Sequence, residues 1–129
     1  MHEFSTMSQI ASAILEEGRK HNASYITKVI LEIGELTFLG EEQLRFAFDL
    51  LKKGTMLEKA ELEIQKKGIK VRCSCGYEGG IEYEEKEEFH FLIPLLRCPR
   101  CNKEVEIIEG RECIVKSVQM EIEDVPTAR

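Results

Sequence analysis

Two cysteine pairs in the second half of the chain constrain its fold more than any other feature. Cys73 and Cys75 form a C-x-C pair, Cys98 and Cys101 form a C-x-x-C pair, and 22 residues separate Cys75 from Cys98. Each pair is followed by a residue suited to a tight turn. Two such turns bring four sulfur ligands to one ion in a zinc ribbon. We therefore expect a structural zinc ion to hold this short, core-poor segment together.

Other interpretations of the cysteines stay open at this point: buried apolar thiols, or a redox-active pair. Four thiolates fill a tetrahedral zinc ion and leave no position for water or substrate, so the predicted site is structural rather than catalytic. The C-x-C pair is one residue shorter than the usual turn, which predicts a different geometry there. Cys113 stands apart among apolar residues. We expect it to be a core thiol, the alternative being that it replaces Cys73 or Cys75 as a ligand.

The rest of the chain has the periodicities of two helices and three strands. Apolar residues recur at helical spacing over residues 3–20 and again over residues 41–53. Apolar and polar residues alternate over residues 25–33, where β-branched side chains dominate, and more briefly around 62–64 and 118–122. Such alternation predicts strands with one buried face.

The strand near the C-terminus needs a sheet to join, and the simplest sheet is the one formed by the two earlier strands. The cysteine-containing segment is then an insertion. We predict an α+β fold in which residues 1–67 and 112–124 form a small mixed sheet of about three strands with two helices. Residues 68–111 form an inserted zinc-ribbon-like domain, and residues 125–129 form a disordered tail.

Charge and hydropathy exclude several classes of function. The net charge is −6, and acidic residues outnumber basic ones in both halves of the chain, which disfavours nucleic-acid binding because that depends on neutralising phosphates. No secretory signal and no apolar run of about 20 residues is found, so we expect no membrane span. A cytoplasmic location follows as an expectation, and cytoplasmic thiols are kept reduced.

The first residues place several potential metal ligands together at the start of a helix. A free α-amine, the imidazole of His2 and the intervening backbone amide nitrogens can surround a metal ion in a plane, and the carboxylate of Glu3 follows. Planar nitrogen coordination suits Ni(II) or Cu(II). Histidine is too large for the initiator methionine before it to be removed readily, so the amine is that of Met1.

Several segments taken in order resemble the HypA family of nickel-insertion accessory proteins for [NiFe]-hydrogenase maturation. They are MHEFS at residues 1–5, LEIGEL at 31–36, FAFD at 46–49 followed by Gly54-Thr55, and the cysteine pairs. The resemblance covers residues 1 to about 123. It implies an α/β domain that binds nickel and an inserted zinc domain.

The resemblance also implies residue roles and partners. It implies that Met1, His2 and Glu3 bind nickel, with the His2 side chain essential, and that zinc is bound by Cys73, Cys75, Cys98 and Cys101. Ni(II) is then a transferable cargo, passed towards the hydrogenase large subunit with a HypB-type GTPase. The two domains are joined twice, so we expect some coupling between the metal sites.

The resemblance leaves homodimer formation open. We expect no catalytic activity, because the chain has no plausible nucleophile and base, no phosphate-binding glycine loop and no open metal position in the cysteine cluster. The alternative function is a zinc-ribbon module that docks a protein or binds nucleic acid.

Overall fold

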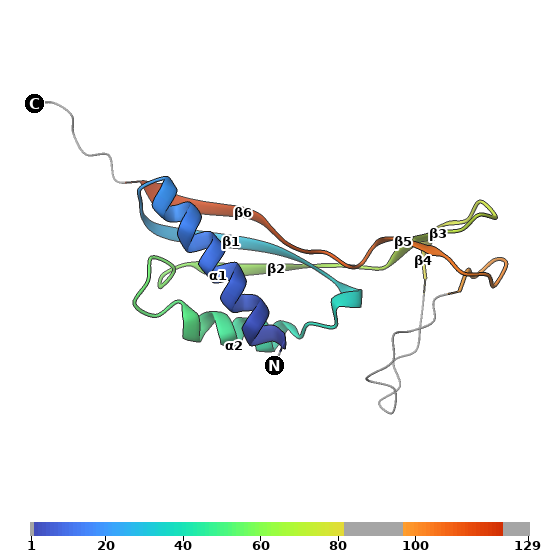
Figure 1. The fold of residues 1–129 in the computed structure, drawn as a ribbon, viewed down its shortest axis with the longest axis horizontal. Coiled ribbons are helices and arrows are strands. Elements are labelled where there is room, and N and C mark those ends of the chain that lie inside the picture. Colours follow the sequence, from blue (N-terminus) through green and yellow to red (C-terminus); the bar gives the residue numbers. More distant parts are fainter. Residues whose placement is uncertain (1, 82–96, 123–129) are drawn as a thin grey trace, which may run out of the picture.

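The computed structural model describes residues 2–81 and 97–122 and contains two small sheets joined by two connections (Figure 1). Two helices cover one face of the larger sheet, which consists of β1, β2 and β6, and the smaller sheet consists of β3, β4 and β5. The elements are α1 (His2–Lys20), β1 (Ala23–Gly34), η1 (Glu35–Thr37), α2 (Glu41–Leu51), β2 (Glu61–Lys67), β3 (Lys70–Arg72), β4 (Glu78–Gly80), β5 (Glu106–Glu109) and β6 (Cys113–Ile122).

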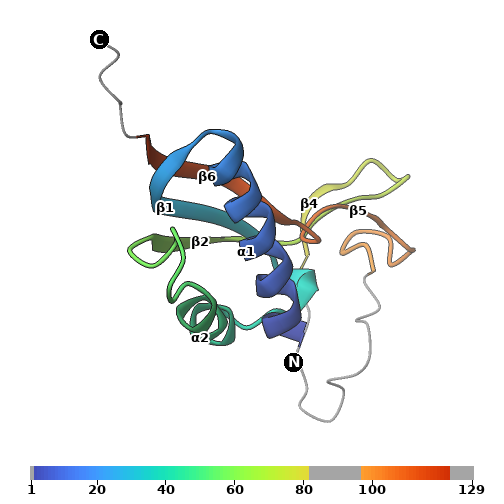
Figure 2. The same cartoon turned by 60° about the vertical axis from the view of Figure 1, so that its left-hand side comes forward.

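Both helices form where the apolar spacing predicts them, and both pack on the same core. Met7, Ala11 and Ile14 are buried on α1, three or four residues apart, and therefore lie on one face of that helix. The buried residues of α2 are Leu44, Ala47 and Phe48. These side chains meet Val29, Leu31 and Ile33 of β1 in one hydrophobic cluster. Figures 1 and 2 show α1 lying across the sheet.

The larger sheet is mixed, in the order β2-β1-β6. β1 runs parallel to β2, with Leu31 opposite Ile64, and antiparallel to β6, with Leu31 opposite Val115. A parallel pair requires a crossover, and η1 and α2 supply it. The predicted fold class, two helices with a small mixed sheet and a zinc-ribbon-like insertion, is confirmed.

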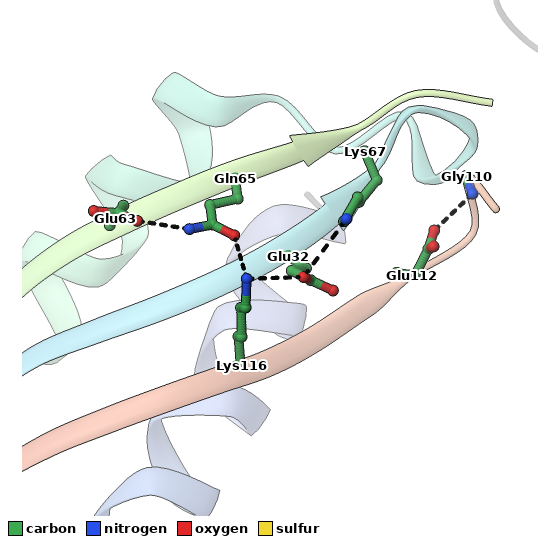
Figure 3. A network of polar contacts seen from close by, with 7 residues as sticks. All are labelled: Glu32, Glu63, Gln65, Lys67, Gly110, Glu112 and Lys116. Carbon is green, nitrogen blue, oxygen red and sulfur yellow. Dashed lines mark hydrogen bonds and ion pairs between the residues drawn. The ribbon is translucent and has the colours of Figure 1, made fainter. Parts of the chain in front are cut away.

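A network of polar side chains crosses the face of this sheet that the helices leave uncovered (Figure 3). Glu32 on the central strand is 13% exposed, and its carboxylate lies 3.9 Å from the Lys67 ammonium on β2 and 3.5 Å from the Lys116 ammonium on β6. Lys116 also donates to the Gln65 side chain at 3.1 Å. Glu32 therefore connects both outer strands to the central one.

The smaller sheet, β4-β3-β5, lies between β2 and β6 in the chain, so the polypeptide leaves the larger sheet after β2 and returns before β6. All its pairings are antiparallel. The proposed domain boundaries at 67/68 and 111/112 stay a prediction. Residues 125–129, expected to be a disordered tail, lie outside the described residues.

The connection that returns from the smaller sheet to β6 touches the end of β1 at a pair of glycines. Gly34 ends β1 with an ordinary extended backbone (φ −78°), but a Cβ atom added there would lie 2.1 Å from the Gly110 carbonyl oxygen. The Gly34 amide donates to the Glu112 carbonyl at 2.7 Å, and the Leu36 amide donates to the Gly110 carbonyl at 2.7 Å. Only glycine leaves room for this approach of two backbones.

The prediction that Cys113 is a core thiol is wrong, because its side chain is exposed. Cys113 begins β6, an outer strand, and its neighbours Ile114 and Val115 are exposed as well. Apolar neighbours in the sequence do not bury a residue on an outer strand where nothing covers it. Partial burial raises the pKa of the Cys113 thiol.

None of the described helices combines the length and the apolar character that a membrane-spanning segment requires.

We predict that Gly34→Ala destabilises the protein by about 3 kcal/mol, because the methyl group must displace the Gly110 backbone. The melting temperature measured by circular dichroism should fall by roughly 10 °C. The control is Gly68→Ala: nothing lies within 4 Å of the position of its Cβ atom, so its stability should change by less than about 1 kcal/mol. Equal melting temperatures for the two variants would contradict the proposed close contact.

Candidate metal sites

Four cysteine side chains converge at the end of the smaller sheet. The sulfur atoms of Cys73, Cys75, Cys98 and Cys101 all lie within 4.8 Å of one another. Two cross-pairs are closer, with Cys73 Sγ 3.4 Å from Cys101 Sγ and Cys75 Sγ 3.6 Å from Cys98 Sγ. The four cysteines that the sequence predicts as ligands are therefore brought together.

The second turn holds its cysteines with backbone hydrogen bonds. The Cys98 amide donates to the Lys103 carbonyl at 2.9 Å, and the Asn102 amide donates to the Cys98 carbonyl at 2.8 Å. The amides of Arg100 and Cys101 point at Cys98 Sγ, at 3.3 and 3.5 Å. Asn102, directly after the second cysteine, has a left-handed backbone (φ 62°), which asparagine tolerates better than most residues.

The first turn repeats this pattern with one residue fewer. The Cys73 amide donates to the Tyr77 carbonyl at 2.8 Å, and the Gly76 amide donates to the Cys73 carbonyl at 3.0 Å. Both bonds span one residue less than their counterparts in the second turn. Gly76 has a left-handed backbone (φ 102°) and directly follows Cys75, as Asn102 follows the second cysteine of its pair. The C-x-C spacing therefore shortens the turn without separating the sulfur atoms.

The surroundings of the thiols shift their pKa values in opposite directions. The Cys75 amide lowers the pKa of Cys73. Burial of Cys98 opposes ionisation, but the amides of Cys101 and Arg100 outweigh it and lower the pKa of Cys98 to about 6. The Lys103 amide lowers the pKa of Cys101, but the neighbouring thiols, Cys73 foremost, together with burial raise that pKa to about 11. A divalent cation among the four sulfurs would remove this conflict.

The donor set fits a tetrahedral thiolate-binding ion. A zinc–sulfur bond of about 2.3 Å places tetrahedral sulfur ligands about 3.8 Å apart, close to the two short separations found here. Softer thiolate ligands select zinc over calcium or magnesium. In the part of the chain that the structure describes, these four cysteines are the one group of three or more side chains close enough to share a metal ion.

The predicted nickel ligands lie elsewhere, at the start of α1. Met1 lies outside the described residues, while His2 is exposed in the first turn of the helix. The Glu3 carboxylate accepts a hydrogen bond from the Gly40 amide at 3.0 Å, and this bond lowers the pKa of Glu3. Gly40 is the residue that caps α2. Glu3 therefore fastens the start of α1 to the start of α2.

A series of hydrogen bonds connects this point to the junction between the sheets. The Thr37 hydroxyl donates to the Gly34 carbonyl at 2.8 Å and accepts from the Leu39 amide at 3.2 Å. Gly34 is bonded to Glu112 at the junction, and the residue after Leu39 is bonded to Glu3. The smaller sheet and the start of α1 are thus linked through the loop between β1 and α2.

The sequence interpretation missed the roles of Gly40 and Thr37. Gly40 is 37 residues from Glu3, and a hydrogen bond between a carboxylate and a distant amide leaves no periodic signal in the chain. Thr37 lies in a loop where a hydroxyl group has many potential partners. The sequence did contain one signal for Gly40: it stands directly before the second helical pattern, and glycine is accepted at the position that precedes a helix.

Comparison with known proteins assigns the chain to a family. A family model described as "Hydrogenase/urease nickel incorporation, metallochaperone, hypA" matches residues 1–120. The hydrogenase maturation factor HypA of Methanothermobacter thermautotrophicus is 37% identical over 96% of this chain and 100% of its own length. The corresponding factor of Aquifex aeolicus is 36% identical over 95% and 100% of the two chains.

A solved structure shares the fold. The solution structure of the Ni metallochaperone HypA from Helicobacter pylori covers 94% of this chain, with 98% of its own length matched, a TM-score of 0.62 and 22% identity. From the family model and the relatives together, we conclude that the chain belongs to the HypA family of nickel-incorporation metallochaperones that act in hydrogenase maturation.

Proposed function

We propose that this chain carries Ni(II) at its N-terminus, bound by the His2 imidazole, the Met1 amine and the backbone amide nitrogens of His2 and Glu3. The first amides of a helix have no partner within it, so their use as metal ligands breaks no helical hydrogen bond. Planar nitrogen ligands suit Ni(II). The Glu3 carboxylate already accepts a bond from Gly40, so we assign Glu3 a ligand role through its amide and a positioning role through its side chain.

This location suits a cargo that must be released. A metal ion held in the interior of a fold leaves only when the fold opens, whereas the first turn of a helix opens at low cost. His2 is exposed, so a recipient can reach the ligand directly. The bond between Glu3 and Gly40 holds the rest of the helix in place while the terminal residues exchange ligands.

We further propose that Cys73, Cys75, Cys98 and Cys101 bind a structural Zn(II). The observation that carries this proposal is the convergence of the four sulfur atoms within 4.8 Å. When bound, zinc supplies the positive charge that lets all four thiols ionise. The cysteines themselves hold the two turns together and complete a sheet too small to have a large core of its own.

The partners follow from the same proposal. A HypB-type GTPase and the [NiFe]-hydrogenase large subunit are the proposed partners in nickel transfer, in the cytoplasm, where cysteines stay reduced. The chain transfers a metal ion without catalysing a reaction of its own.

We predict that one thiol of the metal-free protein ionises near pH 6. The lowered pKa of Cys98 means that its thiolate stabilises the folded state. That contribution is complete above the ordinary thiol pKa of 9.0 and is lost as the pH falls through about 6. Ultraviolet thiolate absorbance should show this step, which Cys98→Ser removes and Cys113→Ser, outside the cluster, leaves unchanged. A first ionisation near pH 9 would refute the assignment.

We predict that His2→Ala weakens Ni(II) binding at least tenfold, equivalent to about 1.4 kcal/mol, because the imidazole is the side-chain ligand. Calorimetric titration of untagged, zinc-loaded protein measures this. His21→Ala is the matched control, since His21 follows the far end of α1 and pairs with Glu17 at 3.5 Å. If both variants bind Ni(II) like the parent protein, the N-terminal site is wrong and a zinc-ribbon docking module becomes the better interpretation.

We predict that loading zinc changes Ni(II) affinity by about 1 kcal/mol, transmitted through the hydrogen bonds at Thr37. Thr37→Val removes both hydroxyl bonds and should make the Ni(II) affinities of zinc-loaded and zinc-free protein equal. Thr27→Val serves as control, because the Thr27 hydroxyl donates to the Gln119 carbonyl at 3.1 Å, away from this path. If the Ni(II) affinities of zinc-loaded and zinc-free Thr37→Val differ as much as those of the parent protein, this route is excluded.

A further inference from the structure

Large apolar side chains are exposed at the start of α1 and along α2. Phe4 is 48% exposed, and Phe46 on α2 is 67% exposed. Leu50, one helical turn after Phe46, is 46% exposed. Phe46 and Leu50 therefore form a stripe on the outer face of α2, opposite the face that carries Leu44 and Phe48 into the core.

Phe4 and Phe46 line a shallow hollow between the two helices. Its volume is about 320 Å³, and Ala47 is part of its wall. The first residue that lines the hollow, Glu3, directly follows His2 in the chain. Figures 1 and 2 show the start of α1 beside α2 in both views. A partner seated in this hollow would be next to the proposed nickel ligands.

The rim of the hollow is acidic. Glu3 and Glu42 line it, together with the neutral Gln43. Arg45, the first basic residue of α2, donates to the Leu62 carbonyl at 2.7 Å and lines a different hollow. An apolar floor with carboxylates at its edge is complementary to an amphipathic segment that carries lysine or arginine.

The loop before α2 presents another exposed aromatic residue under backbone strain. Phe38 has a left-handed backbone (φ 56°), a conformation that is unfavourable for a bulky residue, and is nevertheless 49% exposed. Strained residues cluster at functional sites. Phe38 lines a separate hollow, together with Leu39 and Lys67. Figure 2 shows the start of α1 between α2 and η1, which directly precedes Phe38.

We infer that the hollow between α1 and α2 is the docking site for a basic amphipathic helix of the protein that exchanges nickel with this chain. Apolar residues three and four positions apart on that helix would enter the groove, as in other helix-in-groove complexes. Its lysine or arginine residues would lie against Glu3 and Glu42. The inference rests on the proposed N-terminal nickel site, because nickel transfer is the reason for the docking. The docking contacts themselves use side chains other than that of His2.

The test uses a dye-labelled synthetic peptide of about 14 residues, roughly four helical turns, with leucine on one face and lysine on the other. Fluorescence anisotropy measures its binding to the full-length, zinc-loaded protein. We expect Phe46→Ser, which changes no charge, to weaken binding at least tenfold. Ile114→Ser, at a position 49% exposed on β6, should leave binding unchanged. Glu42→Lys should weaken binding of the lysine peptide and strengthen binding of a matched peptide of leucine and glutamate.

Equal affinity in Phe46→Ser, or equal binding of the lysine and glutamate peptides by the parent protein, overturns the inference. Sedimentation that shows self-association of the parent protein, abolished by Phe46→Ser, overturns it as well, because the occupant is then a second copy. Ni(II) titration of the same variants separates the two proposals. We expect Phe46→Ser to lose peptide binding and to keep Ni(II) binding. If the parent protein binds the peptide but no Ni(II), only the nickel site is refuted.

Discussion

The close approach of Gly34 and Gly110 is the contact on which the arrangement of this molecule depends. The chain passes between the sheets twice, and on its return it meets the end of β1 so closely that a Cβ atom on Gly34 would lie 2.1 Å from the Gly110 carbonyl oxygen. The amides of Gly34 and Leu36 bond to the returning chain at this point. The returning connection is therefore hydrogen-bonded to the end of β1, and the loop that leads to α2 starts from the same junction.

The two metal sites use opposite physical strategies. The cysteine cluster concentrates four sulfur atoms, and it lowers the pKa of Cys98 while raising that of Cys101, a conflict that a divalent ion among the sulfurs would remove. Such a site retains its ion. The proposed nickel site consists of the first residues of a helix, where amides lack partners and local opening is easy. Such a site can release its ion, as a chaperone requires.

The surroundings of the N-terminus suit transfer between proteins better than storage within one. Glu3 fixes the start of α1 to the start of α2, so the helices present a defined groove beside His2. Exposed aromatic side chains on α1 and α2 line that groove, which is the proposed docking site for a partner. A partner that covers it would also exclude water from the ligands during transfer, which strengthens the electrostatic contacts made there.

The sequence alone determined the two helices, the three strands of the larger mixed sheet and the four cysteines that converge, because periodicity and ligand spacing are local properties that the chain carries wherever it folds. The sequence did not predict the three short strands of the smaller sheet. It could not determine that Cys113 is exposed, since burial depends on which strand lies at the edge of the sheet. It also could not show how a C-x-C pair fits the site, which follows from a turn shortened by one residue. The bond between Glu3 and Gly40, the contact of Gly34 with Gly110 and the groove beside Phe46 arose only from the tertiary structure, because each joins residues far apart in the chain through distances that no sequence pattern encodes.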